Sequence, residues 1–231
     1  YDVKHNEENG EKNMDGTQYN YSWNCGAEGY SRKKIVLKTR EKQEKNALVM
    51  LLLGMAMPMI LSGDEFGNSQ KGNNNAYCQD NLITWLDWRL LDKNQKTFQF
   101  TKELIEFRRK HPLYHNDKGL SGADFKGLGA PDVSCHGREP WTADFSYYSR
   151  ELGLLFYGGY YKEQSLYFAF NFHWDSHDFY LPDIKEGKKW EVLFDTSDEV
   201  AKKIDNGKIK MAPRSIVVLK SVTESTLNRM V

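Results

Sequence analysis

The sequence contains few cysteines, and they are not arranged as pairs. Only Cys25, Cys78 and Cys135 occur among 231 residues, far apart and without a CxxC spacing. An odd number at such distances argues against a disulfide framework and against a zinc site. Reduced thiols in a cytosolic enzyme fit best, and one buried disulfide with a free thiol is the alternative. We therefore expect a cytoplasmic location, no metal and no cofactor.

The sequence also lacks net charge. Lys+Arg and Asp+Glu both number 32, whereas a nucleic-acid-binding protein needs a basic face. A local basic patch stays open, but the overall balance predicts no nucleic-acid partner.

Long apolar runs and an N-terminal targeting signal are missing as well. The longest apolar run, Ala47 to Leu53, is too short to span a membrane, so we expect no membrane partner. The chain opens on the polar stretch Tyr1-Asp2-Val3-Lys4. Because the first residue is not Met, we expect a segment of a longer protein.

What is present up to residue 113 has the pattern of α/β structure. Residues 1–30 are rich in Asn, Asp and Gly and predict a long ordered loop. Ser31 is a potential cap for a helix that runs to about Met55 and is solvated first and buried later. The short apolar run 58–63 predicts a buried strand of a parallel sheet.

A second helix is predicted over 94–110, where apolar residues recur at helical spacing and Pro112 follows. Trp85 and Trp88 lie three residues apart just before it, which favours core packing on a short helix.

After residue 113 the pattern changes to that of a β domain. Gly, Asp and Pro are frequent up to residue 140, which predicts a connecting loop over 114–139. Short apolar runs separated by turn signals follow and predict an antiparallel β-sandwich over 140–222, with a tail at 223–231. The runs lie at 154–157, 166–170, 178–181, 190–194 and 216–219.

Three segments together resemble the isoamylase and glycogen-debranching branch of the α-amylase superfamily. The first begins with Lys4-His5-Asn6 and continues through Asn9-Gly10-Glu11 and Asp15-Gly16-Thr17 to Ser22-Trp23-Asn24-Cys25-Gly26. The second is Pro58 to Gly67, and the third runs from Gln70 to Asn81 and ends at Trp85-Leu86-Asp87-Trp88. A fourth match, Pro131 to Gly137, is similar to the family's entry into its C-terminal sandwich, with Cys135 where the family usually has Trp.

The resemblance implies the C-terminal end of a (β/α)8 TIM barrel over 1–113, followed by the β-sandwich. Residues 1–30 would follow the seventh strand, 32–55 would be the seventh helix, 58–62 the eighth strand and 94–110 the eighth helix. It also implies a glycoside hydrolase that acts on α-1,6 branch points of an α-glucan such as glycogen or starch.

Retaining glycosidases need two carboxylates about 5 Å apart. The resemblance places the family's catalytic carboxylates after the fourth, fifth and seventh strands, none of which is in this sequence. We expect no catalytic residue in this chain and no hydrolysis by the chain alone.

The candidate residues for substrate binding lie in the two loops that resemble the family's. Asp64 and Glu65 follow the predicted strand and either orient sugar hydroxyls or close the barrel rim. Amide side chains match vicinal hydroxyls, but they also satisfy the backbone of their own loop. The remaining candidates are His5, Asn6, Asn74, Asn75, Gln79 and Asp80, with Tyr77 as the best stacking residue.

Other functions stay open at this stage. A relative with another bond preference, such as a pullulanase, is one; a non-catalytic carbohydrate-binding module or a structural domain is another. The aromatic content of 13% suits sugar rings as well as apolar cores. The predicted strand at 58–62 would have open edges, so it is covered by helix 32–55, pairs with another copy of the chain, or is poorly ordered.

Overall fold

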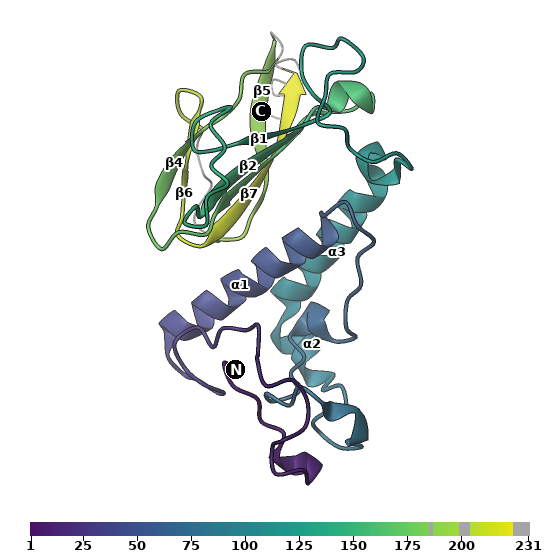
Figure 1. The fold of residues 1–231 in the computed structure, drawn as a ribbon, viewed down its shortest axis with the longest axis vertical. Helices are drawn as coiled ribbons and strands as arrows, with labels where there is room; N and C mark the ends of the chain where they lie inside the picture. Colours follow the sequence, from purple (N-terminus) through teal and green to yellow (C-terminus); the bar gives the residue numbers. More distant parts are fainter. Residues whose placement is uncertain (185–186, 199–203, 224–231) are drawn as a thin grey trace. The chain divides into compact units, whose positions relative to one another are not determined.

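The computed structural model describes residues 1–184, 187–198 and 204–223. The chain forms two compact units, Tyr1–Phe107 and Arg108–Val231. Figure 1 shows helices and loops in the first unit and strands in the second.

The first unit is built from loops and three helices. The helices are α1 (Lys34–Leu52), α2 (Arg89–Lys93) and α3 (Gln95–Lys110), whose last residues lie beyond the boundary at Phe107. Short 3-10 turns lie at Glu7–Asn9, Asp64–Phe66 and Ala76–Cys78. Apart from the first of these turns, residues 1–30 form a loop, and both long helices were predicted from the sequence. Within the described parts of the chain, no helix is long and apolar enough to cross a membrane.

Helix α1 differs from its prediction at both ends. The prediction that Ser31 caps it is wrong: the N-cap is Lys33, and Ser31 only accepts a hydrogen bond from the Lys33 backbone N–H. The helix ends at Leu52, before the predicted end at about Met55. Its apolar C-terminal half is buried on one face, through Leu48, Val49 and Leu52, and exposes the opposite face.

The buried strand predicted over 58–63 is not formed. The segment from Met57 to Leu61 has no ladder partner, and the side chains of Met57 and Met59 are 92% and 87% exposed. Of the residues in this segment, Ile60 lines a cavity together with residues of α1, so the helix covers only one side of the segment. The prediction failed because a strand needs a neighbouring strand for its N–H and C=O groups, and the described residues of this unit contain no other strand.

The second unit consists of a five-stranded and a two-stranded antiparallel sheet. The larger sheet has the order β1-β2-β3-β7-β5, and the smaller one pairs β4 with β6. The bounds are β1 (Val133–His136), β2 (Glu151–Phe156), β3 (Leu166–Asn171), β4 (His177–Tyr180), β5 (Lys188–Asp195), β6 (Lys208–Met211) and β7 (Ser215–Thr223). Two further 3-10 turns lie at Pro112–His115 and Gly158–Tyr160.

Five of these strands were predicted from the sequence, whereas β1 and β6 were not. Strand β1 lies inside the segment 114–139, so the prediction of a connecting loop is wrong for those four residues. They form a strand because they pair with β2, Val133 opposite Phe156 and His136 opposite Gly153.

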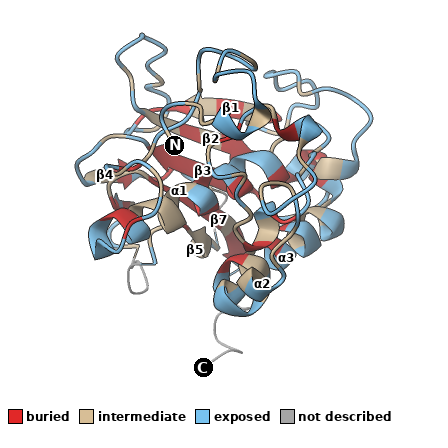
Figure 2. Ribbon diagram, turned by 90° about the horizontal axis from the view of Figure 1, so that it is seen from below, coloured by how far each residue is buried: buried red, intermediate tan, exposed pale blue. Residues whose placement is uncertain are grey.

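The core of the second unit lies between its two sheets. The larger sheet contributes Leu155, Tyr167, Ala169, Val217 and Leu219, and the smaller one contributes Phe179, Ile209 and Met211. Figure 2 shows β2, β3 and β7 as largely buried and the connecting loops as largely exposed. Only one face of the smaller sheet packs on the core, so its other face can contact solvent or a ligand.

Candidate functional site

Two loops of the first unit, residues 4–20 and 72–79, are joined by hydrogen bonds of their side-chain amides. We call them the interlocked loops. Asn6 is fully buried and Asn73 is nearly so. The backbone N–H of His5 donates to the Gly72 carbonyl at 2.8 Å, which aligns the loops. Since these residues lie more than 50 positions apart in the sequence, the bonds fix the tertiary structure of both loops and not only their local turns.

Asn6 and Asn74 form the first link between these loops. Asn6 Oδ1 accepts the Asn74 backbone N–H at 3.0 Å, and Asn6 Nδ2 donates to Asn74 Oδ1 at 2.9 Å. Asn74 Nδ2 in turn donates to the Thr17 carbonyl and to Asn20 Oδ1. Both side chains named as substrate-binding candidates are therefore committed to protein partners.

Asn9 and Asp15 form the second link. Asp15 Oδ2 accepts hydrogen bonds of 2.8 Å from Asn9 Nδ2 and Asn75 Nδ2, which lower the pKa of that carboxyl. Asn9 Oδ1 accepts from Gln79 Nε2 at 2.7 Å and from Asn73 Nδ2 at 2.8 Å. Asp15 is therefore an ionised hydrogen-bond acceptor at neutral pH and unsuited to the role of a proton donor.

Glycine is required where the two loops approach most closely. Gly16 has φ +70°, and a Cβ there would lie 2.3 Å from Asn74 Oδ1 and 2.8 Å from Asn6 Nδ2. Any side chain at this position would push the loops apart.

His5 belongs to the first of the interlocked loops, and its side chain contacts Tyr1 and Glu28. Its Nε2 is 3.0 Å from Glu28 Oε1, and its ring packs edge-on against Tyr1 at 5.2 Å between centroids. The backbone N–H of Asp2 and then the His5 ring hold the pKa of Glu28 down at about 2. His5 has a structural partner, which was one of its two predicted roles.

Asp64 and Glu65 are separate from the interlocked loops. Glu65 Oε2 accepts the Gly63 backbone N–H at 2.9 Å, so Glu65 closes its own turn. Asp64 lines a cavity of about 290 Å³ with Glu44 and Leu48 of α1. Desolvation raises the pKa of Asp64, and the charge of Glu65 adds to this rise.

Tyr77 and Asp80 lie in exposed positions of the second loop. The Tyr77 ring is 86% exposed, as a stacking residue would need. Asp80 Oδ1 accepts the Trp85 indole N–H at 2.8 Å. The expected core packing of Trp85 and Trp88 is wrong, because they are 56% and 65% exposed; Trp88 packs on Phe66 with 5.6 Å between ring centroids.

Sequence reasoning missed Asn9, Asn13 and Asp15 as partners of the candidate residues. They belong to the motif that carries the family resemblance, but their spacing does not indicate that they bond to residues 73–79. The Asn6 backbone N–H donates to Asn13 Oδ1 at 2.9 Å, which closes the turn. The interlocked loops therefore form a polar surface that carries two exposed aromatic rings, Tyr19 and Tyr77.

In the second unit, Ser134 and His136 lie as close as a nucleophile and its base, but the hydrogen bond between them runs in the wrong direction for that chemistry. Ser134 Oγ is 2.8 Å from His136 Nε2, and the Trp141 backbone N–H donates to His136 Nδ1 at 3.0 Å. Since Nδ1 accepts, Nε2 carries the proton and donates to the serine, so the ring cannot take the serine proton. Burial lowers the pKa of His136 to about 4. Across the described part of the chain, no three His, Cys, Asp or Glu side chains are grouped as a metal site.

The solved structures that are similar to this chain include pullulanases. The apo pullulanase of Paenibacillus barengoltzii is similar with a TM-score of 0.58 and 17% identity, over 83% of this chain and 26% of that one. The Bacillus subtilis type I pullulanase, complexed with maltose, has a TM-score of 0.59 and 20% identity over 78% and 23%. No family model matches the sequence. The chain therefore has the fold of a part of these α-amylase-type structures.

Curated relatives narrow this class. The chain is 33% identical over 215 residues to the glycogen operon protein GlgX homolog of Mycobacterium tuberculosis, which covers 87% of this chain and 30% of that protein. It is 33% identical over 233 residues to the chloroplastic isoamylase 3 of Oryza sativa, covering 96% and 28%. Over 124 residues it is 48% identical to the glycogen debranching enzyme of Erwinia tasmaniensis, covering 54% and 18%.

The chain belongs to the isoamylase-type glycogen-debranching group of the α-amylase superfamily and corresponds to a C-terminal segment of such a protein. It spans about 30% of the length of the first of these relatives.

Proposed function

We propose that the chain is the C-terminal segment of a debranching glycoside hydrolase that cleaves α-1,6 branch points of glycogen- or starch-type glucans. The catalytic carboxylates of its retaining mechanism belong to another part of the parent protein, and this segment alone is inactive. The 33% identity to a glycogen operon protein and to an isoamylase, each over more than four fifths of the chain, is the observation that supports this function best.

The exposed segment from Met57 to Leu61 supports the proposal that the first unit is one part of a barrel. Its side chains are apolar, and its backbone has no ladder partner. Such a segment is stable when strands pair with both of its edges, as in a closed parallel barrel. In the isolated chain, the same exposed methionines favour self-association, which size-exclusion chromatography measures.

The interlocked loops support a role at the rim of the substrate cleft. In βα-barrels the loops that follow the strands form the active face, and the resemblance assigns 1–30 and 66–81 to such loops. Their amides are bonded to each other, so we propose that they fix the position of exposed groups such as Tyr77, whereas the exposed ring contacts the glucan.

The similar structures support a glucan as the ligand. The pullulanase of Anoxybacillus sp. LM18-11 is complexed with maltotetraose, and that of Paenibacillus barengoltzii with maltohexaose and α-cyclodextrin. A pullulanase-like bond preference is the second candidate, because every solved structure cited above is a pullulanase. The free thiols of Cys25, Cys78 and Cys135 support a reducing, cytoplasmic location.

The test compares substrates and chain lengths. The full-length parent protein is incubated with glycogen, pullulan and amylose, and the released reducing ends are counted. We expect release from glycogen, little from amylose, and none from any substrate with the 231-residue chain alone. Hydrolysis of amylose as fast as that of glycogen would contradict the α-1,6 assignment. Release of reducing ends by the 231-residue chain alone would contradict the proposal that the catalytic carboxylates belong to another part of the parent protein.

A further inference from the structure

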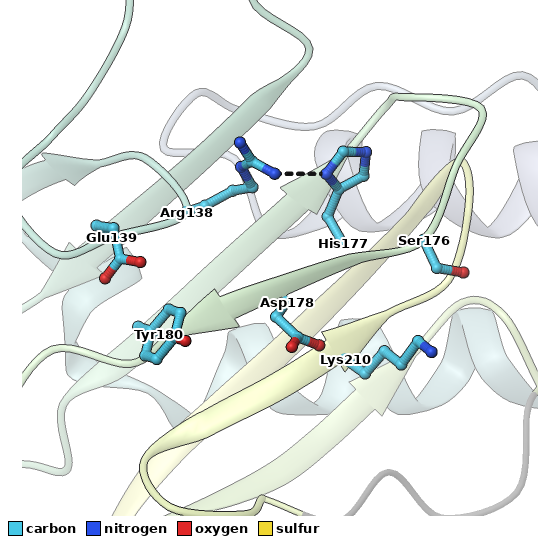
Figure 3. Close-up of a pocket in the computed structure, with 7 residues that line it drawn as sticks. All are labelled: Arg138, Glu139, Ser176, His177, Asp178, Tyr180 and Lys210. Atoms are coloured by element: carbon cyan, nitrogen blue, oxygen red, sulfur yellow. Dashed lines mark hydrogen bonds between the residues drawn. The ribbon is translucent and has the colours of Figure 1, made fainter.

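The second unit contains a cavity of about 530 Å³ on the outer face of β4 and β6. Figure 3 shows that its side chains come from these two strands, from the turn after β1 and, for Ser176, from the position just before β4. A volume of this size lies in the range of small-ligand sites.

Alternation along the two strands builds the floor of this cavity. Phe179 and Ile209 are fully buried in the core, so their neighbours in sequence point outward. The register places Asp178 opposite Lys210 and Tyr180 opposite Lys208. The outer face therefore combines two cations, one carboxylate and an aromatic ring that is 39% exposed.

Lys208 holds Asp178 and Tyr180 in place and leaves Lys210 available. The Lys208 ammonium donates to Asp178 Oδ2 at 2.8 Å and lies 5.7 Å from the centre of the Tyr180 ring. Among the residues that the structure describes, the Lys210 ammonium has no hydrogen bond or ion pair, although its charge contributes to lowering the pKa of Asp178.

The turn that forms the wall of the cavity is rigid. The Thr142 hydroxyl donates to the Glu139 carbonyl at 2.8 Å, and the Tyr180 backbone N–H donates to the Arg138 carbonyl at 2.7 Å. A Cβ at Gly137 would lie 2.5 Å from the Thr142 carbonyl oxygen, so the turn is closed as tightly as glycine permits. Arg138 and Glu139 are thereby held beside β4 before any ligand arrives.

The chemistry of the lining fits a neutral polyhydroxylated ligand. Arg138 and Lys210 supply donors, and Glu139 and Asp178 supply acceptors, so the four charges cancel. An anionic ligand would find carboxylates on the same surface, whereas vicinal hydroxyls bond to donors and acceptors side by side. The exposed Tyr180 ring offers the apolar face that a sugar ring packs against.

We propose that this face of β4 and β6, together with the turn at 137–142, binds a segment of an α-glucan chain. This site is distinct from the interlocked loops of the first unit and rests on the proposed function only for the identity of the sugar. Trp141 and Trp174 lie two residues along the chain from Glu139 and Ser176 of the lining and are 60% and 61% exposed, with Trp141 packed on His136 and Trp174 on His173.

The test is binding of maltoheptaose to the 231-residue chain, measured by isothermal titration calorimetry. We expect Tyr180→Ala to lower the affinity about tenfold, as the loss of one aromatic platform does, and Lys210→Ala to lower it by a smaller factor. Tyr148→Ala is the matched control, because Tyr148 is 82% exposed in the same unit and outside the cavity; it keeps the affinity of the unaltered chain.

Three results would overturn the proposal. One is an unchanged affinity in Tyr180→Ala and Lys210→Ala. Another is loss of binding in Tyr77→Ala but not in Tyr180→Ala, which would place the glucan on the loops of the first unit. The last is displacement of maltoheptaose by inorganic phosphate, which would identify an anion site. If Tyr180→Ala does not fold, Asp178→Asn combined with Lys210→Ala tests the same cavity.

The two proposals fail separately. A full-length parent that debranches glycogen, with a chain that does not bind maltoheptaose, would overturn only the surface site. A chain that binds through Tyr180, with a parent that does not debranch, would overturn only the proposed function.

Discussion

Buried His136 makes the stability of the second unit depend on pH in a defined window. Its ring is fully buried in β1 and neutral, with Nδ1 accepting from the Trp141 backbone and Nε2 donating to Ser134. Protonation would place a second N–H against the Trp141 N–H and a charge in an apolar setting. We expect the unfolded chain to take up this proton below pH 6.5 and the folded chain only near pH 4.

The sign and size of the effect follow from this difference in pKa. Because the folded pKa lies below the unfolded one, the stabilisation is fully present above pH 6.5 and is lost as the pH falls toward 4. A difference of about 2.5 pH units, at roughly 1.4 kcal/mol per unit, corresponds to about 3.5 kcal/mol. This is an upper value, since partial opening of the site would let the ring reach water.

The assay is urea unfolding of the chain at a series of pH values between 4 and 7.5, followed by near-UV circular dichroism. Other groups also titrate in this range, so the measured quantity is the difference between the native chain and His136→Gln. That variant is less stable at pH 7.5, but its stability falls less steeply between pH 6.5 and 4. His115→Gln, on an exposed turn, serves as the control.

Parallel pH dependences for the native chain and His136→Gln would refute the reasoning, and so would an NMR titration of His136 with a midpoint near 6.5. Either result would mean that the ring is hydrated or that Nδ1 is not an acceptor in solution.

Three further predictions concern the packing of both units. Gly153→Ala would place a Cβ 2.1 Å from the buried Tyr167 hydroxyl, and we expect a loss of about 2 kcal/mol or more in the free energy of unfolding, measured by urea titration. Asn6→Ala removes the buried link between the two loops, and we expect faster hydrogen exchange in 4–20 and 72–79, with a local loss of about 1–3 kcal/mol. Protonation of Glu28 between pH 4.5 and about 2 releases the N-terminal segment, which hydrogen exchange detects, and Glu28→Gln shows this release at neutral pH.

Matched variants separate these effects from general damage. Gly119→Ala meets no atom within 4 Å and leaves stability unchanged, in contrast to Gly153→Ala. Asn116→Ala removes an exposed amide that lies outside both loops. Equal effects in either pair would contradict the roles assigned to Tyr167 and Asn6.

Local patterns predicted the elements whose partners lie close by or whose apolar face is continuous. Helix α3 was predicted because its periodicity and Pro112 are both visible in the sequence. Strand β3 was predicted from its run of aromatic and aliphatic residues. Strands β1 and β6 were missed, because β1 lies among turn-forming residues and half of β6 consists of lysines that point outward. Their identity as strands depends on pairing with β2 and β4, which a local pattern does not contain.

The segment 58–63 is the opposite case. Its sequence pattern is that of a strand, but the segment forms no strand in the structure. Its apolar residues fit the interior of a sheet, but this chain supplies no neighbouring strand for it. Likewise, the amides at 6 and 73–79 were recognised as chemically notable, but their bonds span more than 60 positions. The sequence contained the groups, and only the fold determined whether they would face a ligand or each other.

The position of β7 has a consequence for folding during synthesis. It lies inside the larger sheet, between β3 and β5, although it follows both in the sequence. On a ribosome, β3 and β5 would leave the exit tunnel without the strand that joins them. Their apolar residues then stay accessible to chaperones until β7 emerges and closes the sheet in a single late step. A ribosome that stalls before residue 215 would therefore present an unfolded second unit, however complete the rest of its core residues are.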